Sequence, residues 1–286
     1  MKISEEKTMK KLITFALFIS LIVLAACGSD ASDGGDSSDG GSNTIHVGAT
    51  SGPFSDMLTD GIAPIIEEDG YELKVTEFHD YIQPNNALDE GDIDANLYQN
   101  SIYLEQFNED HGMDLVAPYA VPTAPIALYS DKHDSLDDLE EGMKITLPND
   151  PTNLARSLHM LKDEGYIEID ESVKQTIASE KDITKNDLNL DIQPMEAAQT
   201  VRSLNDADFA FVNGNFALAA DLKFADAVIL EDTIEEYLIY LTVRAGEEDE
   251  EFAQVLEEAF KSDEFYEYTK ENLDGFVLPP YQLERE

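Results

Sequence analysis

Short runs of alternating or continuous apolar residues recur along the chain, between longer segments in which apolar residues repeat every three or four positions. The short runs are typical of β-strands and the longer segments of amphipathic helices. Strands that alternate with helices favour an α/β fold with largely parallel sheets. The first unit is a predicted strand over 45–49, followed by a predicted helix over 54–68 whose pattern is interrupted by Pro64.

The later elements fall into two groups, separated by an extended segment that contains Pro118, Pro122 and Pro125. We predict strands over 71–78, 93–97, 115–118, 126–129, 144–147, 188–193, 208–212, 228–230 and 237–244. We predict helices over 85–89, 101–110, 149–164, 195–204, 216–221, 250–261 and 263–272. Two α/β groups joined by proline-rich crossings indicate two lobes, with a ligand cleft at the carboxyl ends of their strands. We expect residues 44–130 with 231–286 to form lobe 1 and residues 131–230 to form lobe 2.

The N-terminal segment has a different pattern, in which a basic start is followed by the apolar run 12–26. A membrane-spanning helix needs about 20 apolar residues, and this run is shorter, as in the apolar core of a secretory signal. The run ends in Leu-Ala-Ala-Cys-Gly, with Cys27 in the position that bacterial lipoproteins modify with lipid. We therefore predict a signal peptide over 1–26, for which either Met1 or Met9 is the true start.

Cys27 is the only cysteine, so it cannot form a disulfide within the chain. A diacylglycerol and an N-acyl chain such as palmitate on this residue would anchor the protein stably to the extracytoplasmic face of the cell membrane. Residues 29–43 are almost wholly Gly, Ser and Asp. Because such a composition has nothing apolar to bury, we predict that 27–43 is a lipidated cysteine followed by a flexible acidic linker.

The charge of the chain is −43, and removal of 1–26, with its four Lys and two Glu, leaves −45. Such a charge excludes nucleic acid and an acidic membrane surface as partners. Carboxylates spread along the whole body are typical of a solvated surface adapted to high salt or to high external pH, where salt screens the repulsion between them.

The sequence carries none of the common catalytic signatures, neither a phosphate-binding glycine-rich loop nor a zinc-protease or serine-hydrolase motif. The histidines lack the spacing of metal ligands; they are His46, His79, His111, His133 and His159. We therefore expect a protein that is not an enzyme and that holds no metal and no cofactor.

Two polar residues are candidates for contact with a charged ligand. Arg156 lies one turn inside the predicted helix over 149–164, where its guanidinium and the positive end of the helix would bind a carboxylate. A surface salt bridge is the alternative role for Arg156. Asn213 follows the predicted strand over 208–212 and offers a donor and an acceptor, although an asparagine before glycine is also common in turns.

Three aromatic residues, Tyr81, Tyr98 and Tyr103, lie at predicted strand ends or at the helix starts beyond them. A wall of aromatic rings would suit an apolar or thioether side chain, because sulfur packs well against rings. Ordinary core or rim tyrosines are the alternative interpretation.

Several segments, taken in order, resemble one family of bacterial lipoproteins. They are Tyr-Ile-Gln-Pro-Asn over 81–85, Gly-Asp-Ile-Asp-Ala-Asn over 91–96, Tyr-Gln over 98–99, Pro-Asn-Asp-Pro-Thr-Asn-Leu-Ala-Arg-Ser-Leu over 148–158, and Ser-Asp-Glu over 262–264. The body is similar to the methionine-binding lipoproteins of bacterial ABC importers, the NlpA or MetQ-type family, over nearly its whole length.

This resemblance implies a two-lobed α/β periplasmic-binding-protein fold of type 2. The chain would be monomeric, and it would close on L- or D-methionine and deliver it to the permease and ATPase subunits of an importer. Arg156 would bind the ligand carboxylate, with Asn153 in the same motif, and Asn213 would hydrogen-bond the backbone groups of the amino acid. The three tyrosines would surround its side chain.

Two positions depart from the family pattern. Asn100 stands where the family commonly has His, and Ile239 replaces an Asn in the late strand. Loss of a buried hydrogen-bond partner leaves a polar ligand group unpaired, at a cost of roughly 1–3 kcal/mol. A related amino acid or a methionine-containing dipeptide is therefore an alternative ligand. A structural or adhesive surface lipoprotein is an alternative function.

Overall fold

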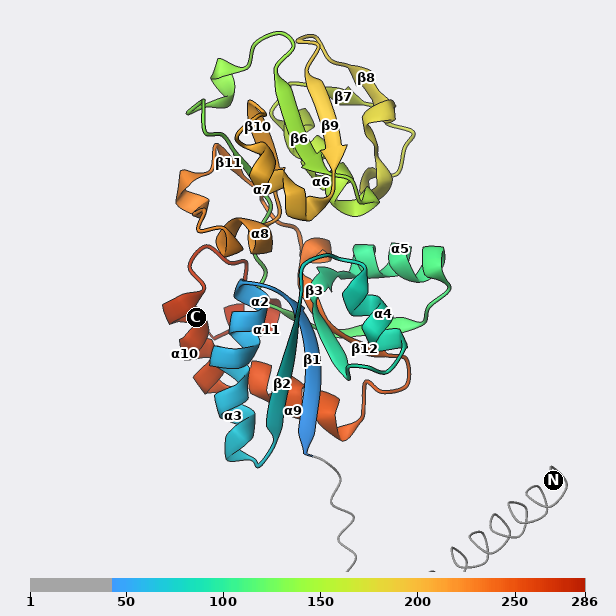
Figure 1. Ribbon diagram of the computed structural model, residues 1–286, viewed down its shortest axis with the longest axis vertical. Coiled ribbons are helices and arrows are strands. Elements are labelled where there is room, and N and C mark those ends of the chain that lie inside the picture. Colours follow the sequence, from blue (N-terminus) through green and yellow to red (C-terminus); the bar gives the residue numbers. More distant parts are fainter. Residues whose placement is uncertain (1–42, 286) are drawn as a thin grey trace, which may run out of the picture. The chain divides into compact units, whose positions relative to one another are not determined.

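The computed structural model describes residues 43–285, which build two five-stranded mixed sheets. The first sheet has the order β2-β1-β3-β12-β4 and forms the core of lobe 1, the lower half of Figure 1. Strands β1 and β2 are parallel, as are β1 and β3, whereas β12 is antiparallel to both β3 and β4. The bounds are β1 Thr44–Thr50, β2 Glu72–Phe78, β3 Ala95–Asn100, β4 Leu115–Val121 and β12 Ile239–Arg244.

The second sheet has the order β11-β5-β10-β6-β9 and forms the core of lobe 2 (Figure 1). Strands β10, β6 and β9 are parallel, whereas β5 is antiparallel to β10 and β11. The bounds are β5 Ala127–Tyr129, β6 Lys144–Pro148, β9 Asp191–Met195, β10 Phe209–Val212 and β11 Ile229–Leu230. A small hairpin, β7 Glu168–Ile169 with β8 Ile183–Lys185, extends lobe 2.

Helices cover both sheets. Those of lobe 1 are α2 Pro53–Asp56, the π-helix η1 Met57–Ile62, α3 Ala63–Glu68, α4 Gln83–Asp89, α5 Ser101–His111, α9 Glu251–Phe260, α10 Asp263–Asn272 and α11 Pro280–Leu283. Those of lobe 2 are α6 Pro151–Asp163, α7 Thr200–Ser203 and α8 Gly214–Ala219. Short 3-10 turns are η2 Leu136–Asp138, η3 Gln175–Ile177, η4 Glu180–Asp182, η5 Ala197–Gln199, η6 Phe224–Asp226 and η7 Glu235–Tyr237.

The predicted two-lobed α/β fold is confirmed, but the sheets are mixed rather than largely parallel. The antiparallel strands β5 and β12 follow the two segments that cross between the lobes, and no βαβ crossover sets their direction. Strand β5 pairs with β10 and β11 of the second sheet, whereas the predicted boundary at residue 130 placed it in lobe 1. The first crossing is therefore 122–126, and the return crossing is 231–238.

Pro64 explains why the predicted helix over 54–68 forms in three pieces. Proline has no N–H, so it cannot donate the hydrogen bond that an α-helix requires at that position. One residue earlier, the Ala63 N–H donates to Leu58 O, five residues back, as in a π-helix. The widened turn η1 thus continues the helical path into α3 without a break.

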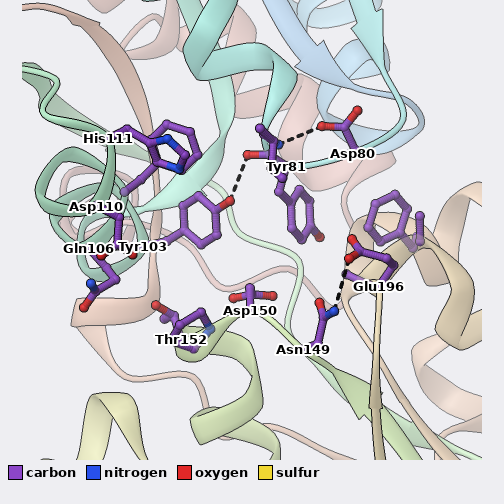
Figure 2. A pocket seen from close by; sticks show the side chains of 16 residues that line it. Asp80, Tyr81, Tyr103, Gln106, Asp110, His111, Asn149, Asp150, Thr152 and Glu196 are labelled. Atoms are coloured by element: carbon purple, nitrogen blue, oxygen red, sulfur yellow. Dashed lines mark hydrogen bonds between the residues drawn. The ribbon is translucent and has the colours of Figure 1, made fainter.

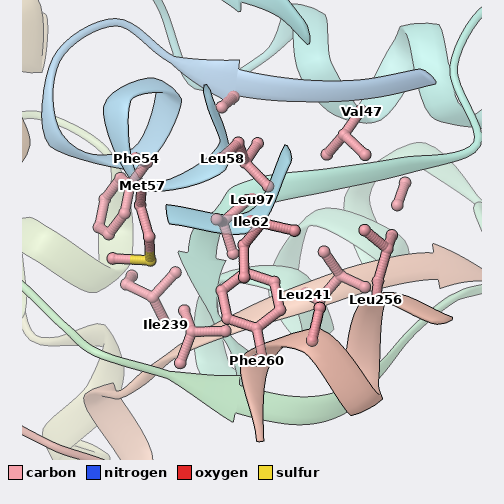
Figure 3. Close-up of a cluster of buried hydrophobic side chains, with 14 of the residues drawn as sticks. Val47, Phe54, Met57, Leu58, Ile62, Leu97, Ile239, Leu241, Leu256 and Phe260 are labelled. Atoms are coloured by element: carbon pink, nitrogen blue, oxygen red, sulfur yellow. The ribbon is translucent and has the colours of Figure 1, made fainter. Parts of the chain in front are cut away.

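Each lobe has its own apolar core. In lobe 1, Leu58 and Ile62 of the first helical segment pack with Leu97 of β3, Leu241 of β12 and Phe260 of α9 (Figure 3). In lobe 2, Ile145 and Leu147 of β6 and Phe209 and Phe211 of β10 pack against the buried face of α6, which includes Leu158. Leu218 of α8 in lobe 2 also packs against the lobe 1 core, so the lobes touch in addition to the covalent link that the crossings provide.

The predicted signal peptide, the lipid site at Cys27 and almost all of the predicted linker lie outside the described residues. Within residues 43–285, no helix is long and apolar enough to cross a membrane.

The acidic surface predicts a stability that depends on salt. Acidic residues number 61 and basic residues 18, so repulsion between carboxylates opposes the folded state. We expect the melting temperature to rise between about 0.01 M and about 0.1 M sodium chloride, because the Debye length falls from about 30 Å to about 10 Å. Thermal unfolding followed by circular dichroism measures this, with sucrose of equal osmolality as the control. A melting temperature that stays constant or falls with salt would contradict the expectation.

Candidate functional site

The two crossing segments are paired where they pass from one lobe to the other. The Glu231 N–H donates to Ile126 O at 3.0 Å, and the Ile126 N–H donates to the Glu231 carboxylate at 3.4 Å. Further along, the Ile239 N–H donates to Thr123 Oγ1 at 2.7 Å. These bonds hold the two segments side by side where they pass between the lobes.

Helix α8 begins directly against the first crossing. A Cβ on Gly214 would lie 2.5 Å from Pro125 O, so only glycine permits this approach. From the next residue, the Asn215 side chain reaches across to lobe 1. Asn215 Oδ1 accepts from the Tyr81 hydroxyl at 2.7 Å, and its Nδ2 donates to Thr50 Oγ1 at 3.2 Å. The lobes therefore make direct contact around the cleft.

All seven residues that the sequence predicts to bind ligand line one inner cavity of about 20 Å³ between the lobes. This volume accommodates about one water molecule. Its wall is made of Phe54, Tyr81, Tyr98, Gln99, Asn100, Tyr103, Ala124, Asn153, Arg156, Asn213, Gly214, Asn215 and Ile239.

A larger outer chamber of about 250 Å³ adjoins the inner cavity, and Tyr81 and Tyr103 line both. Figure 2 shows these two tyrosines of lobe 1 facing Asp150 and Thr152 at the start of α6 in lobe 2. The other residues around the chamber are Asp80, Ile82, Gln106, Phe107, Asp110, His111, Asn149, Pro151, Glu196, Ala197, Ala198 and Phe216. The outer chamber and the inner cavity together make one cleft between the lobes.

The three predicted tyrosines form a single cluster. The Tyr81 and Tyr98 rings are stacked, with centroids 5.7 Å apart, and the Tyr103 ring meets both edge-on. The hydroxyls of Tyr98 and Tyr103 both donate to Tyr81 O at 2.8 Å. Burial raises the pKa of Tyr81 and of Tyr98 well above the ordinary value, so these hydroxyls stay protonated donors.

Arg156 is 4 % exposed, and its guanidinium is held on several sides. Its Nε and Nη2 donate to the two carboxylate oxygens of Glu231 at 2.8 and 2.6 Å. Its Nη1 donates to Asn153 Oδ1 at 3.0 Å, and the Tyr237 ring centre lies 4.5 Å from its Cζ. Both Glu231 and Tyr237 belong to the return crossing, so Arg156 ties α6 to that crossing at two points.

The Arg156–Glu231 pair remains ionised. Burial alone would raise the pKa of Glu231, but the charge of Arg156 and its hydrogen bonds outweigh burial and lower that pKa. Burial likewise opposes the charge on Arg156, yet Glu231 raises its pKa. The guanidinium therefore reaches the cavity already paired with a carboxylate of the chain.

Asp150 and Asn153 extend this polar contact towards the outer chamber. Asp150 caps α6 by accepting from the Asn153 N–H at 3.0 Å. The Asn153 Nδ2 also donates to both Asp150 oxygens at 3.0 and 3.1 Å, which leaves its Oδ1 facing Arg156. Asp150 lies on the chamber wall, where burial raises its pKa against the lowering effect of these hydrogen bonds.

Asn213 is 6 % exposed and follows β10 at its carboxyl end, as predicted, on the wall of the inner cavity. Its Oδ1 is buried and has no hydrogen-bond partner among residues 43–285. A buried unpaired acceptor costs about 1–3 kcal/mol, so such a group indicates a donor supplied from elsewhere. An ammonium group in the inner cavity would satisfy this oxygen.

The two departures from the family pattern lie next to each other. Ile239 of β12 pairs with Asn100 of β3 in the sheet, and both side chains line the inner cavity. Asn100 Oδ1 caps α5 by accepting from the Tyr103 N–H at 2.8 Å. At this point the cavity wall therefore consists of the apolar side chain of Ile239 and the amide of Asn100, whose oxygen already accepts a hydrogen bond from α5.

Sequence reasoning missed Glu231, Tyr237 and Asn215. Glu231 belongs to an acidic stretch of a very acidic chain, in which nothing in the pattern sets it apart. Asn215 follows Asn213 in a turn sequence, and only the folded chain shows that it spans the lobes. Among residues 43–285, no group of three His, Cys, Asp or Glu side chains is arranged to hold a metal ion.

Comparison with known proteins places the chain in a family. The sequence model described as NlpA lipoprotein matches residues 45–281, nearly all of the described chain. The chain belongs to the NlpA lipoprotein family. The resemblance stated from the sequence motifs is thereby confirmed, and this family consists of binding proteins rather than enzymes.

Other members of the NlpA family are similar along their whole length. The D-methionine-binding lipoprotein MetQ of Escherichia coli K12 is 37% identical over 273 residues, which cover 93% of this chain and 97% of the relative. The methionine-binding lipoprotein MetQ of Bacillus subtilis is 35% identical over 277 residues, covering 95% and 99%. The structure of a nutrient-binding protein from Burkholderia cenocepacia bound to methionine has a TM-score of 0.78 and 37% identity, covering 82% and 99%.

The hydrogen bond between Tyr81 and Asn215 leads to a stability prediction. In Tyr81→Phe the Asn215 Oδ1 loses its one partner among the described residues while it stays buried. We expect the free energy of unfolding to fall by about 1–3 kcal/mol, as measured by urea denaturation. The matched control is Tyr71→Phe, because the Tyr71 hydroxyl bonds Glu251 on the exposed surface. An equal fall in the free energy of unfolding in both variants would contradict the expectation, because the buried bond between the lobes would then stabilise the protein no more than an exposed one.

Proposed function

We propose that this protein is a lipid-anchored extracytoplasmic binding protein that captures a methionine-like amino acid, L or D. It then delivers the amino acid to the permease and ATPase subunits of an ABC importer. The observation that supports this proposal most directly is that one cavity is lined by groups of both lobes. Lobe 2 contributes the Arg156 guanidinium and the unpaired Asn213 amide oxygen, and lobe 1 contributes three tyrosines.

Each part of an amino acid has a matching group in the cleft. A guanidinium has five N–H donors, and three of those on Arg156 have partners among the described residues, which leaves two for a ligand carboxylate. Asn213 Oδ1 would accept from the α-ammonium group. The tyrosine cluster would pack against a thioether side chain, since sulfur is favourable against aromatic rings.

The arrangement of the lobes supports capture by closure. A ligand that touches Arg156 of lobe 2 and Tyr98 of lobe 1 has more contacts when the lobes are together, so it favours that arrangement. The paired crossings 122–126 and 231–238 are the segments about which such a movement would take place. A lipid on Cys27 would keep the body at high local concentration beside its membrane partner.

The relatives support methionine as the first ligand to test. The similar proteins from Escherichia coli and Bacillus subtilis are named for methionine binding, and the Burkholderia cenocepacia structure holds methionine. A similar structure from Coxiella burnetii, 31% identical with a TM-score of 0.77, is described as a periplasmic substrate-binding protein of an ABC transporter. The matched region covers 82% of this chain and 100% of the Coxiella burnetii chain.

Asn100 and Ile239 support a second class of ligand besides methionine. The resemblance implies a histidine and an asparagine at these two adjacent places on the cavity wall, so a ligand would have fewer polar partners there. The outer chamber of about 250 Å³ would also admit a larger molecule than one amino acid. A related amino acid or a methionine-containing dipeptide is therefore the alternative to methionine.

Isothermal titration calorimetry of the full chain with L-methionine, D-methionine and methionine-containing dipeptides tests this proposal. The decisive variant is Arg156→Lys, which keeps the positive charge but loses the forked donor geometry. We expect binding about tenfold to about a hundredfold weaker, since hydrogen bonds to charged groups contribute about 1.5–3 kcal/mol.

The control is Arg202→Lys, the same change at an exposed site outside the cleft. It should leave the affinity unchanged. The absence of heat with every amino acid and dipeptide would overturn the proposed ligand class, whereas full affinity in Arg156→Lys would overturn the role of Arg156.

A further inference from the structure

Glu231 occupies the position at Arg156 that a ligand carboxylate would be expected to take. Its two oxygens accept from Nε and Nη2 of Arg156 at 2.8 and 2.6 Å, the two-pronged geometry typical of carboxylate recognition by arginine. The two side chains are 4% and 6% exposed, so water screens this pair little.

Glu231 is also fixed in place. Thr233 Oγ1 donates to Glu231 Oε2 at 2.7 Å, and the Ile126 N–H of the other crossing approaches the same oxygen at 3.4 Å. The backbone of Glu231 pairs with Ile126 as well. A ligand could not displace this carboxylate from Arg156 without disturbing the paired crossings.

The consequence is electrostatic. A ligand carboxylate that approaches the two remaining donors of Arg156 meets a neutral ion pair instead of a free positive charge. Asp150 adds a further negative charge, since it is linked to Arg156 through Asn153. The pull on a ligand carboxylate is therefore weaker than that of an unpaired guanidinium in the same cavity.

We propose that Glu231 is a specificity-determining residue, which orients Arg156 and limits how strongly the cavity prefers a ligand with a free carboxylate over one without. Glu231 would act through Arg156 and would not touch the ligand itself. This inference rests on the proposed function in that it takes the amino-acid cleft as the binding site.

The variant Glu231→Gln tests the proposal, because glutamine has nearly the same shape and keeps one oxygen for Arg156. Calorimetry of the full chain compares L-methionine with L-methioninamide, which lacks the carboxylate. We expect the ratio of the dissociation constants, amide over acid, to be about tenfold larger in Glu231→Gln than in the unchanged protein. A purely structural loss would weaken both ligands together and leave this ratio as it was.

The matched control is Glu247→Gln, at a second two-pronged pair of Arg and Glu, far from the cleft. The Arg244 Nε donates to Glu247 Oε1 at 2.9 Å, and Arg244 Nη2 forms an ion pair with Glu247 Oε2 at 2.9 Å. Neither residue lines the inner cavity or the outer chamber. The ratio should be the same in this variant as in the unchanged protein. A ratio that does not rise in Glu231→Gln, or that rises equally in Glu247→Gln, overturns the proposal.

A second measurement tests the role of Glu231 without any amino-acid ligand. In Glu231→Gln the buried guanidinium lacks its counter-charge, so a small carboxylate should restore it. We expect sodium acetate to raise the melting temperature of Glu231→Gln more than sodium chloride of equal ionic strength does, with no such difference in the unchanged protein or in Glu247→Gln. If no amino acid binds, the proposed function fails. In that case the acetate experiment alone tests the role of Glu231. The same change in melting temperature in the unchanged protein, Glu231→Gln and Glu247→Gln would overturn that role.

Discussion

A buried ion pair between Arg156 and Glu231 is the interaction on which the cleft depends. Removing two charges from water is costly, and the cost is offset only when the geometry is good and the remaining hydrogen bonds are made. Here the two-pronged contact, Asn153 and Thr233 provide those bonds. Loss of one partner from such a pair costs about 3–5 kcal/mol, because it leaves an uncompensated buried charge.

The pair also connects the parts of the cleft. Arg156 belongs to α6 of lobe 2, while Glu231 belongs to the crossing that returns to lobe 1. From Arg156 the polar contacts continue through Asn153 to Asp150, at the wall of the outer chamber. The opposite side of the cleft is aromatic and belongs to lobe 1, and the Tyr81 hydroxyl joins it to lobe 2 through Asn215. A ligand between these two sides would contact both lobes and the crossing at once.

The sequence predicted the two lobes because alternating strands and helices have clear periodicities, and proline-rich segments mark the crossings. The seven predicted binding residues line one cavity, although their role in binding stays a prediction. These positions came from strand ends, a helix start and family motifs, which are all local signals. The pairing of Arg156 was not predictable, because its partner lies 75 residues away in an acidic stretch. Likewise, the direction of β5 and β12 depends on the crossings and not on their own residues.

Both departures from the family pattern were visible in the sequence, but their relation was not. Asn100 and Ile239 are far apart along the chain, and only the pairing of β3 with β12 brings them to the same part of the cavity wall. Both side chains line the same inner cavity as Asn213, whose Oδ1 has no hydrogen-bond partner among the described residues. A ligand in this cavity would meet the apolar side chain of Ile239 at the place where the resemblance implies an asparagine.

In the binding mode that we propose, the ligand lies between the lobes, with its carboxylate at Arg156 and its side chain at the tyrosines. The most direct measurement is the anomalous X-ray signal of selenomethionine, added as a ligand to crystals of the protein made with ordinary methionine. We expect one strong selenium peak inside the cleft, beside Tyr81, Tyr98 and Tyr103. A selenium peak outside the cleft, or no peak at saturating ligand, would contradict this binding mode.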